Sequence, residues 1–199
     1  MKLSRTNTIL AKMKDQGITH ALVSDPYSIF YLTGFLENPG ERFFAILLDE
    51  NGNHKLFLNI LFPLEEDLGL EIVSYSDTDD IISKVAEYIP DGTKLGIDKI
   101  LPARFLLPLM DKLPKTKFVD VSVLVDTTRM LKDEEEKELM RISSELNDKA
   151  CQFVIDNITE HTTEKDLVKL PDNLNISNLY VLKIEFTMLE DNTLKDMKG

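Results

Sequence analysis

The chain is 199 residues long, 43% of them hydrophobic and 29% charged, and its formal net charge at pH 7 is −12. This length predicts one domain, or one domain with an appendage, and the apolar content is sufficient for a hydrophobic core. The negative charge argues against a nucleic-acid groove and against an anionic membrane surface, because both present phosphate groups. We therefore expect a soluble, acidic, cytoplasmic protein with no nucleic-acid or membrane partner.

Cys151 is the only cysteine, which excludes an intrachain disulfide and a cysteine-based zinc site and fits a reducing compartment. Because Cys151 lies in a helical pattern beside Phe153 and Val154, we expect a small buried apolar residue rather than a nucleophile. Residues 1–17 interleave apolar and polar side chains, which indicates an amphipathic helix and not a signal peptide. No apolar run approaches the roughly 18 residues that a membrane span requires.

Helical and strand-like patterns alternate through the first part of the chain. The predicted elements are a helix ending at Gly17, a strand at 20–25, a helix at 27–33, a hairpin over 43–61 around Asn51-Gly52, a strand at 71–75, a helix at 79–89, a strand at 94–98, a helix at 102–113 and a strand at 117–121. This alternation predicts an α/β domain that ends near Val125, with a mixed β-sheet and helices on both faces.

The sequence changes character after this domain. Residues 133–158 predict one long helix with an apolar stripe and an acidic first turn, where the helix dipole favours negative charge. A short helix follows Thr163, and residues 180–188 form a strand-like run. No glycine occurs between Gly96 and Gly199, so we do not expect a second complete β-rich domain.

Residues that could carry chemistry do not form a recognisable constellation. The three histidines, His20, His54 and His161, are not in metal-binding motifs, and no phosphate-binding glycine motif or nucleophile elbow occurs. Carboxylates at the ends of predicted strands could gather around Mg²⁺, as in a metal-dependent nuclease, although aspartate there is commonly a turn or cap residue. These carboxylates are Asp25, Asp49 and Asp98.

Several segments, in this order, resemble the creatinase/prolidase/aminopeptidase P group of metallopeptidases. They are DPYSIFYLTGF (25–35), NPGERFFAILLDENG (38–52), KLGID (94–98) and DTTRMLKDEEEKELMRISSELNDKA (126–150). The segment that leads into the catalytic domain of this family has a similar spacing of charged residues. Here these residues are Arg129, Lys132, Glu138 and Arg141. The segment ITEHTTEKDL (158–167) is also similar, with His161 in place of a glycine.

The resemblance implies a ribonuclease-H-like N-terminal domain over residues 1–127. It also implies a linker helix and the start of a truncated peptidase domain over 128–170, and a divergent tail over 171–199. Full-length relatives hydrolyse the bond before proline with two divalent metal ions (Mn, Co or Zn), held by two aspartates, a histidine and two glutamates. Glu185 would match the last of these ligands, as a remnant, or would belong to an unrelated tail. We therefore expect no catalytic residue, no metal ligand and no cofactor in this chain, and an inactive protein.

The resemblance also suggests a loop that reaches the substrate cleft of a partner subunit, with Tyr31, Phe35, Glu41 and Arg42 as its candidate residues. Arg42 would offer a planar donor fork to a peptide carboxylate, and Glu41 would hold Arg42 or a substrate amine. The alternative is an ordinary exposed ion pair beside a core aromatic cluster.

Two functions follow from the resemblance. In the first, the chain is the N-terminal domain of a Xaa-Pro dipeptidase-like protein, which dimerises and shapes the substrate cleft. The expected homodimer would form through this domain or through the helix at 133–158. In the second, the chain is an acidic α/β binding module that associates with a full-length peptidase paralogue.

Overall fold

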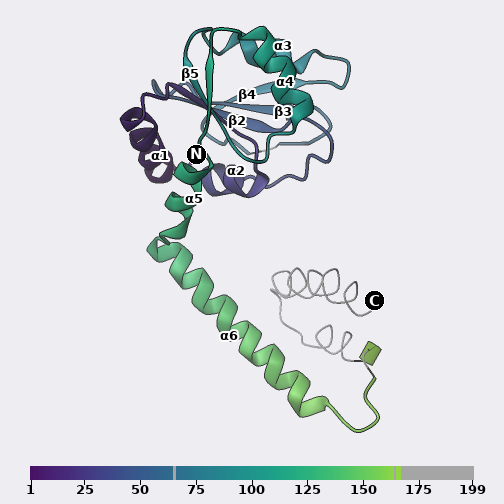
Figure 1. Ribbon diagram of the computed structural model, residues 1–199. Helices are drawn as coiled ribbons and strands as arrows, with labels where there is room; N and C mark the ends of the chain where they lie inside the picture. The colour runs from purple at the N-terminus through teal and green to yellow at the C-terminus, as the bar shows by residue number, and fades with distance from the viewer. Residues whose placement is uncertain (65, 164, 167–199) are drawn as a thin grey trace, which may run out of the picture. The chain divides into compact units, whose positions relative to one another are not determined.

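The computed structural model describes residues 1–64, 66–163 and 165–166, and the chain divides into two compact units, Met1–Leu131 and Lys132–Gly199. The first unit is an α/β domain (Figure 1). Its elements are α1 (Leu3–Asp15), β1 (His20–Val23), α2 (Pro26–Thr33), β2 (Ala45–Asp49), β3 (Lys55–Asn59), β4 (Glu71–Tyr75), α3 (Ile81–Glu87), β5 (Lys94–Ile97), α4 (Ala103–Lys112), β6 (Lys117–Asp120) and α5 (Ser122–Met130).

The strands form one six-stranded mixed sheet in the order β4-β3-β2-β1-β5-β6. The β1–β2 and β2–β3 pairs are antiparallel, and the β3–β4, β1–β5 and β5–β6 pairs are parallel. The predicted hairpin is confirmed as β2 and β3, with Gly52 at a positive φ of 87° in its turn. The mixed α/β fold predicted from the sequence is therefore confirmed.

Helices cover both faces of the sheet (Figure 1). The sheet therefore separates the core into two layers. One layer holds buried residues of α1, α2 and α5, among them Ile9, Ile29 and Leu124. The other holds buried residues of α3 and α4, among them Val85 and Leu109. Strands β1 and β2 are buried along their whole length because helices pack on each side of them.

Local signals set the ends of α2. The Asp25 side chain accepts from the backbone N–H of Ser28 at 3.0 Å and caps the helix, and Pro26 occupies its first turn. Gly34 ends the helix at a φ of 85°, a left-handed conformation that glycine adopts without a steric penalty. The predicted helix at 27–33 is thus confirmed as α2.

The helix α5 was not expected from the sequence. It follows β6 after one residue, and its apolar residues Leu124 and Val125 are buried beneath the sheet. The sequence SVLVDTTRM is rich in β-branched residues, which have low intrinsic helix propensity. Tertiary packing therefore decides the conformation of this segment.

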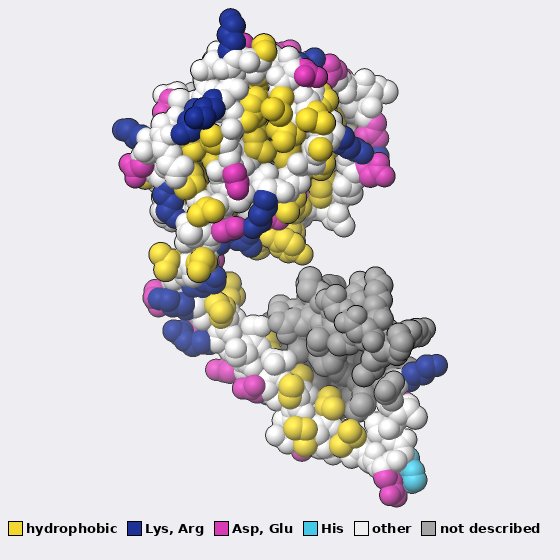
Figure 2. Space-filling view, viewed as in Figure 1, with side chains coloured by type: hydrophobic (Ala, Val, Ile, Leu, Met, Phe, Trp, Pro, Cys, Tyr) yellow, Lys and Arg dark blue, Asp and Glu magenta, His cyan; other side chains and the backbone are white. Residues whose placement is uncertain are grey.

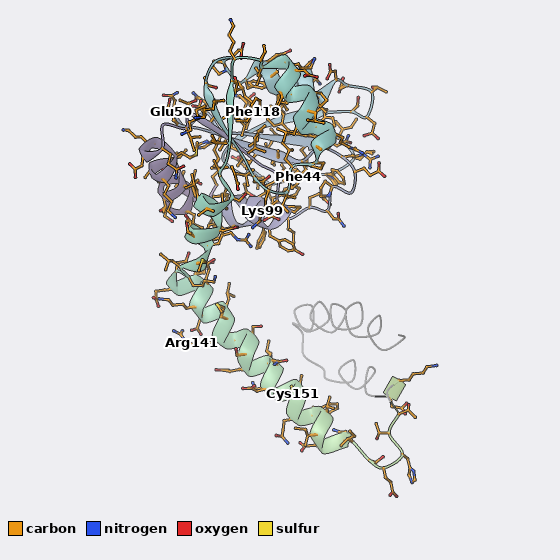
Figure 3. The ribbon with its side chains drawn as sticks, viewed as in Figure 1. Phe44, Glu50, Lys99, Phe118, Arg141 and Cys151 are labelled. Atoms are coloured by element: carbon orange, nitrogen blue, oxygen red, sulfur yellow. The ribbon has the colours of Figure 1, made fainter. Side chains whose placement is uncertain are left out.

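The described part of the second unit contains the helix α6 (Glu134–Asn157), which confirms the predicted long helix. Asp133 and Glu136 form a capping box at its start. Cys151 is exposed on α6 (Figure 3), so the expectation that it is buried was wrong. The predicted strand at 180–188, the tail 171–199 and Glu185 lie outside the described residues. No helix within the described ranges has the length and apolar character to cross a bilayer.

Candidate functional site

The candidate site is the Glu41–Arg42 loop, residues 37–44, which connects α2 to β2. A tight turn positions it: the N–H of Arg42 donates to the carbonyl of Pro39 at 3.0 Å. Gly40, inside this turn, has a φ of 56°, which favours glycine. The loop therefore has a defined backbone conformation.

Asp77 holds the guanidinium of Arg42. Nε and Nη2 of Arg42 donate to the two carboxylate oxygens of Asp77 at 2.9 and 2.7 Å, a bidentate geometry. Asn59 donates to the same carboxylate at 2.7 Å. The hydrogen bond with Asp77 raises the pKa of Arg42, and the hydrogen bond with Arg42 lowers the pKa of Asp77. Arg42 is thus charged and oriented before any ligand binds.

Glu41 has a different partner. Its carboxylate lies 3.4 Å from Nη1 of Arg104 on α4, and Nη2 of Arg104 donates to its backbone carbonyl. Of the two roles predicted for Glu41, holding Arg42 was therefore wrong, because Arg42 pairs with Asp77 and Glu41 pairs with Arg104. The other role, holding a substrate amine, stays a prediction. The Glu41 side chain remains 89% exposed, so its carboxylate is available to solvent.

Two adjacent aromatic residues anchor the end of the loop. Phe43 and Phe44 are 2% and 3% exposed and enter opposite layers of the core. The Phe43 ring packs edge-on against Phe105 at 5.2 Å, and Phe44 packs in the same way against Phe35 at 6.1 Å. The hydroxyl of Tyr75 donates to the carbonyl of Phe43 at 2.7 Å.

A small pocket of about 200 Å³ lies against the loop. It is mostly apolar, with Ser24 and Arg42 as its polar lining residues. The others are Pro26, Pro39, Gly40, Phe43, Phe44, Ile100, Leu101, Pro102 and Phe105. Its volume suits one apolar side chain better than a drug-sized ligand.

Tyr31 is not part of this loop. It is 8% exposed, its hydroxyl donates to the carbonyl of Thr128 at 3.4 Å, and the guanidinium of Arg5 lies 4.3 Å from its ring centre. Of the four candidate residues, the structure brings Glu41 and Arg42 together on the loop and Phe35 against its anchor, whereas Tyr31 packs under α5.

The strand-end carboxylates do not gather at one point. Asp49 lies opposite His20, the first residue of β1, so it is at the other end of the strands from Asp25 and Asp98, which follow β1 and β5. Asp98 accepts from the backbone N–H groups of Ser24 and Asp25 at 2.7 and 2.8 Å. Nowhere in the part of the chain that the structure describes do three or more His, Cys, Asp or Glu side chains form a possible metal site. The described residues do not fit a two-metal centre, and we assign none of them a role in hydrolysis.

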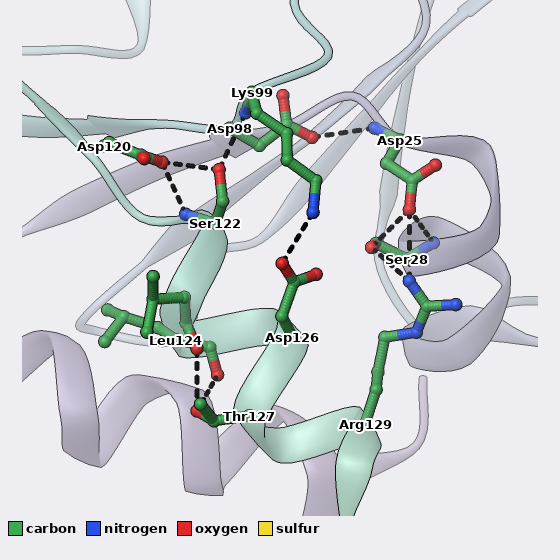
Figure 4. Close-up of polar contacts among 11 residues, drawn as sticks. Asp25, Ser28, Asp98, Lys99, Asp120, Ser122, Leu124, Asp126, Thr127 and Arg129 are labelled. Atoms are coloured by element: carbon green, nitrogen blue, oxygen red, sulfur yellow. Dashed lines mark hydrogen bonds and ion pairs between the residues drawn. The ribbon is translucent and has the colours of Figure 1, made fainter.

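Polar side chains instead attach α5 to the sheet (Figure 4). Nη1 of Arg129 lies 3.2 Å from Oδ2 of Asp25 and the same distance from Oγ of Ser28. Nζ of Lys99 donates to Asp126 at 2.6 Å. Arg129, which the sequence analysis identified only as part of a spacing pattern, therefore joins the last helix of the domain to the start of α2.

Sequence reasoning missed Asp77 and Arg104, the two residues that fix the loop. Asp77 stands in the acidic turn SDTDD and Arg104 in the first turn of α4, 35 and 63 residues beyond their partners. In the sequence, both residues resemble ordinary charged surface residues. Their pairing with the loop can be seen only in the folded structure.

Comparison with known proteins places these features in a family. The Creatinase/Prolidase N-terminal domain family matches residues 5–131. An uncharacterized peptidase of Staphylococcus saprophyticus is 29% identical over 172 residues, which are 84% of this chain and 47% of that protein. The structure is similar to a prolidase from Thermococcus sibiricus, with a TM-score of 0.76 and 26% identity over 85% of this chain and 48% of that one.

A solved creatinase/prolidase N-terminal domain of an X-Pro dipeptidase from Streptococcus pyogenes has the same fold, with a TM-score of 0.54 and 19% identity. The similarity covers 64% of this chain and 99% of that one. The chain spans about half the length of the curated relatives it matches. The sequence match over residues 5–131 and the mixed six-stranded sheet together show that this chain belongs to the creatinase/prolidase N-terminal domain family.

Proposed function

We propose that this chain acts as the non-catalytic N-terminal domain of a Xaa-Pro dipeptidase-like or aminopeptidase P-like metallopeptidase. In this role it associates as a dimer and contributes the Glu41–Arg42 loop to the substrate cleft of a catalytic half. The metal ions and the hydrolytic residues belong to that catalytic half, and the acidic composition favours a cytoplasmic location.

The observation that carries this proposal is that both charged residues of the loop have partners elsewhere in the fold. Arg42 pairs with Asp77, which also accepts from Asn59, and Glu41 pairs with Arg104. A loop that only connects two elements needs neither ion pair. A loop that presents a charged group to a peptide requires its side chains in one geometry, and supporting residues provide this preorganisation.

A peptidase assay tests the non-catalytic role. The purified chain is incubated with Mn²⁺ and a Xaa-Pro dipeptide, with a full-length prolidase as the positive control. We expect no turnover by the chain, and metal-dependent turnover that copurifies with it would contradict the proposal.

A mixing experiment tests the contribution to a substrate cleft. A full-length peptidase paralogue is assayed with and without an excess of this chain. A mixed dimer should change its KM for a Xaa-Pro dipeptide, and the change should disappear with the Arg42→Ala variant. Recovery of the paralogue with the chain but no change in KM would favour the second function, a binding module that only associates with the peptidase.

A further inference from the structure

The pocket of about 200 Å³ beside the Glu41–Arg42 loop lies at the carboxyl ends of two strands. Its lining residue Ser24 follows β1, and Ile100 and Leu101 stand in the segment that connects β5 to α4. The strands β1 and β5 are parallel neighbours in the sheet. In α/β proteins, ligands bind in crevices outside the carboxyl ends of parallel strands. The fold therefore places this pocket where a ligand site is expected.

The apolar lining of this pocket is held in place by the residues around it. Pro26, Pro39 and Pro102 contribute to the lining, and the ring of proline fixes its φ. The buried ring of Phe43 packs edge-on against Phe105, which also lines the pocket. Apolar cavities of about 150 Å³ accept a group the size of benzene. The side chain of a leucine or a phenylalanine therefore suits this pocket.

Arg42 is the one charged residue in the described lining, and part of its guanidinium is unused. A guanidinium has five N–H donors, and Asp77, which is outside the lining, accepts one from Nε and one from Nη2. Within the described part of the chain, Nη1 has no hydrogen-bond acceptor. The Nη1–Nη2 edge of Arg42 is thus open to a second carboxylate, and the side chain is 37% exposed.

We propose that this pocket binds the C-terminal residue of a peptide. Its apolar side chain occupies the pocket, and its carboxylate accepts from the Nη1–Nη2 edge of Arg42. Figure 2 shows a broader apolar area over α4, where Leu107 and Met110 are exposed. The pocket differs from that area because Arg42 adds a cation to an enclosed apolar lining, so an apolar group that ends in an anion is complementary to it.

A peptide end suits this site better than a free amino acid. In a free amino acid the ammonium group is on the carbon next to the carboxylate, so it would approach the guanidinium, which has the same charge. In a peptide the same nitrogen belongs to a neutral amide. The hydroxyl of Ser24 donates to Asp98 at 2.6 Å, and its oxygen keeps lone pairs that can accept an amide N–H.

An NMR chemical-shift titration of the isotope-labelled chain tests the site, with the dipeptide Gly-Leu as the probe. Gly-Gly lacks the apolar side chain, Gly-Leu amide lacks the carboxylate, and free leucine has its ammonium beside the carboxylate. We expect saturable shifts of the amide signals of Gly40, Phe43 and Phe105 with Gly-Leu, and a Kd on the order of 1 mM. The other three compounds should bind at least about tenfold more weakly.

Two variants of the lining test the same contacts from the protein side. Arg42→Gln removes the cation, and Ile100→Glu places an anion in the lining at a residue that is 47% exposed. Leu3→Glu is the matched control, because Leu3 is 67% exposed on α1 and is not in the lining. Both lining variants should raise the Kd for Gly-Leu at least about tenfold, and the control should leave it unchanged. Circular dichroism verifies that each variant folds.

Gly-Leu amide or free leucine that binds as tightly as Gly-Leu overturns the assignment of a peptide carboxylate, and so does unchanged binding in Arg42→Gln. The absence of saturable shifts up to about 20 mM Gly-Leu overturns the site itself. The pocket adjoins the loop of the proposed function, but its affinity for a peptide requires no catalytic half. Failure here therefore leaves the effect on KM in the mixing experiment as a separate test of that function.

Discussion

Asp77 is the centre of the interactions that hold the candidate loop. Its carboxylate accepts two hydrogen bonds from Arg42 and one from Asn59, whose own side-chain oxygen accepts from the N–H of Leu61 at 3.0 Å. A single carboxylate thus connects the loop to the ends of β3 and β4. Because both charged partners are exposed, their contribution is to geometry and much less to global stability.

Replacing this carboxylate should loosen the loop. In Asp77→Ala, Arg42 loses its bidentate partner, and cleavage after Arg42 by a trypsin-like protease should become faster, with little change in Tm. Limited proteolysis with mass spectrometry measures the rate. Asp111→Ala is the control, because Asp111 is an exposed carboxylate on α4 away from the loop. Equal cleavage rates in the two variants would show that Asp77 does not restrain the loop.

His54 should make stability depend on pH. Its Nδ1 accepts from the N–H of Asp49 at 3.2 Å, and burial lowers its pKa below the usual 6.5, although the nearby Asp49 carboxylate opposes this. Below pH 6.5 the unfolded chain therefore binds a proton that the folded chain resists. The stabilisation is present above pH 6.5 and is lost as the pH falls from 6.5 through the folded-state pKa.

Urea unfolding of the wild type and His54→Gln, at about pH 7.5 and pH 5.5, measures this effect. The glutamine oxygen can accept the same N–H but does not titrate, so the variant should lose less free energy of unfolding between the two pH values. Identical losses would mean that His54 titrates alike in the folded and unfolded states.

Among elements, β5 depends on a glycine for close packing. Gly96 is paired with Ala21 of β1 and Val119 of β6. A Cβ at this position would overlap a methyl group of Val121 and lie 3.2 Å from the Cβ of Ala21. No side chain fits between the sheet and the start of α5.

Gly96→Ala should therefore lower the free energy of unfolding by about 1–3 kcal/mol, because the added methyl overpacks the core. Denaturant unfolding measures the change. The double variant Gly96→Ala/Val121→Ala should be less destabilised than the sum of the two single variants, since it removes the overlapping methyl groups. Additive losses would indicate that the sheet accommodates the methyl by another movement.

The attachment of α5 gives a second prediction at this scale. Arg129→Ala removes the contacts with Asp25 and Ser28 and should cost about 1 kcal/mol, because Asp25 keeps its cap hydrogen bonds with Ser28. Amide hydrogen exchange in α5 should become faster. Arg141→Ala is the control, as its partner Glu138 lies on the same exposed helix. Unchanged exchange in α5 would show that the apolar contacts alone hold it.

Elements with strong local signals could be predicted from the sequence, and those decided by packing could not. Asn51-Gly52 predicts the hairpin, and Gly34 predicts the end of α2, because each glycine permits a backbone conformation that other residues resist. α5 has no such signal and becomes helical because Leu124 and Val125 find a place in the core. Likewise, adjacency in sequence suggested a Glu41–Arg42 pair, whereas the fold supplies each with a distant partner.

At the scale of the whole molecule, the buried clusters that form the two core layers end at Val125 among the residues that the structure describes. A fragment of residues 1–131 should therefore fold alone and unfold cooperatively, with a Tm within about 5 °C of the first transition of the full chain. Thermal circular dichroism measures this. Gradual, non-cooperative melting of the fragment would contradict it.

Phe43 and Phe44 enter opposite layers of the core, one residue apart. Shifting the chain by a single position would exchange their directions, so that each ring would have to repack in the core layer that the other occupies. Residues inserted between Gly34 and Pro39 should enlarge the loop and leave the guanidinium of Arg42 in place, because the turn and the pair with Asp77 follow them. An insertion after Gly40 would disturb either the turn or the aromatic pair. We therefore expect changes in loop length to be tolerated best in the four residues 35–38 that precede the turn.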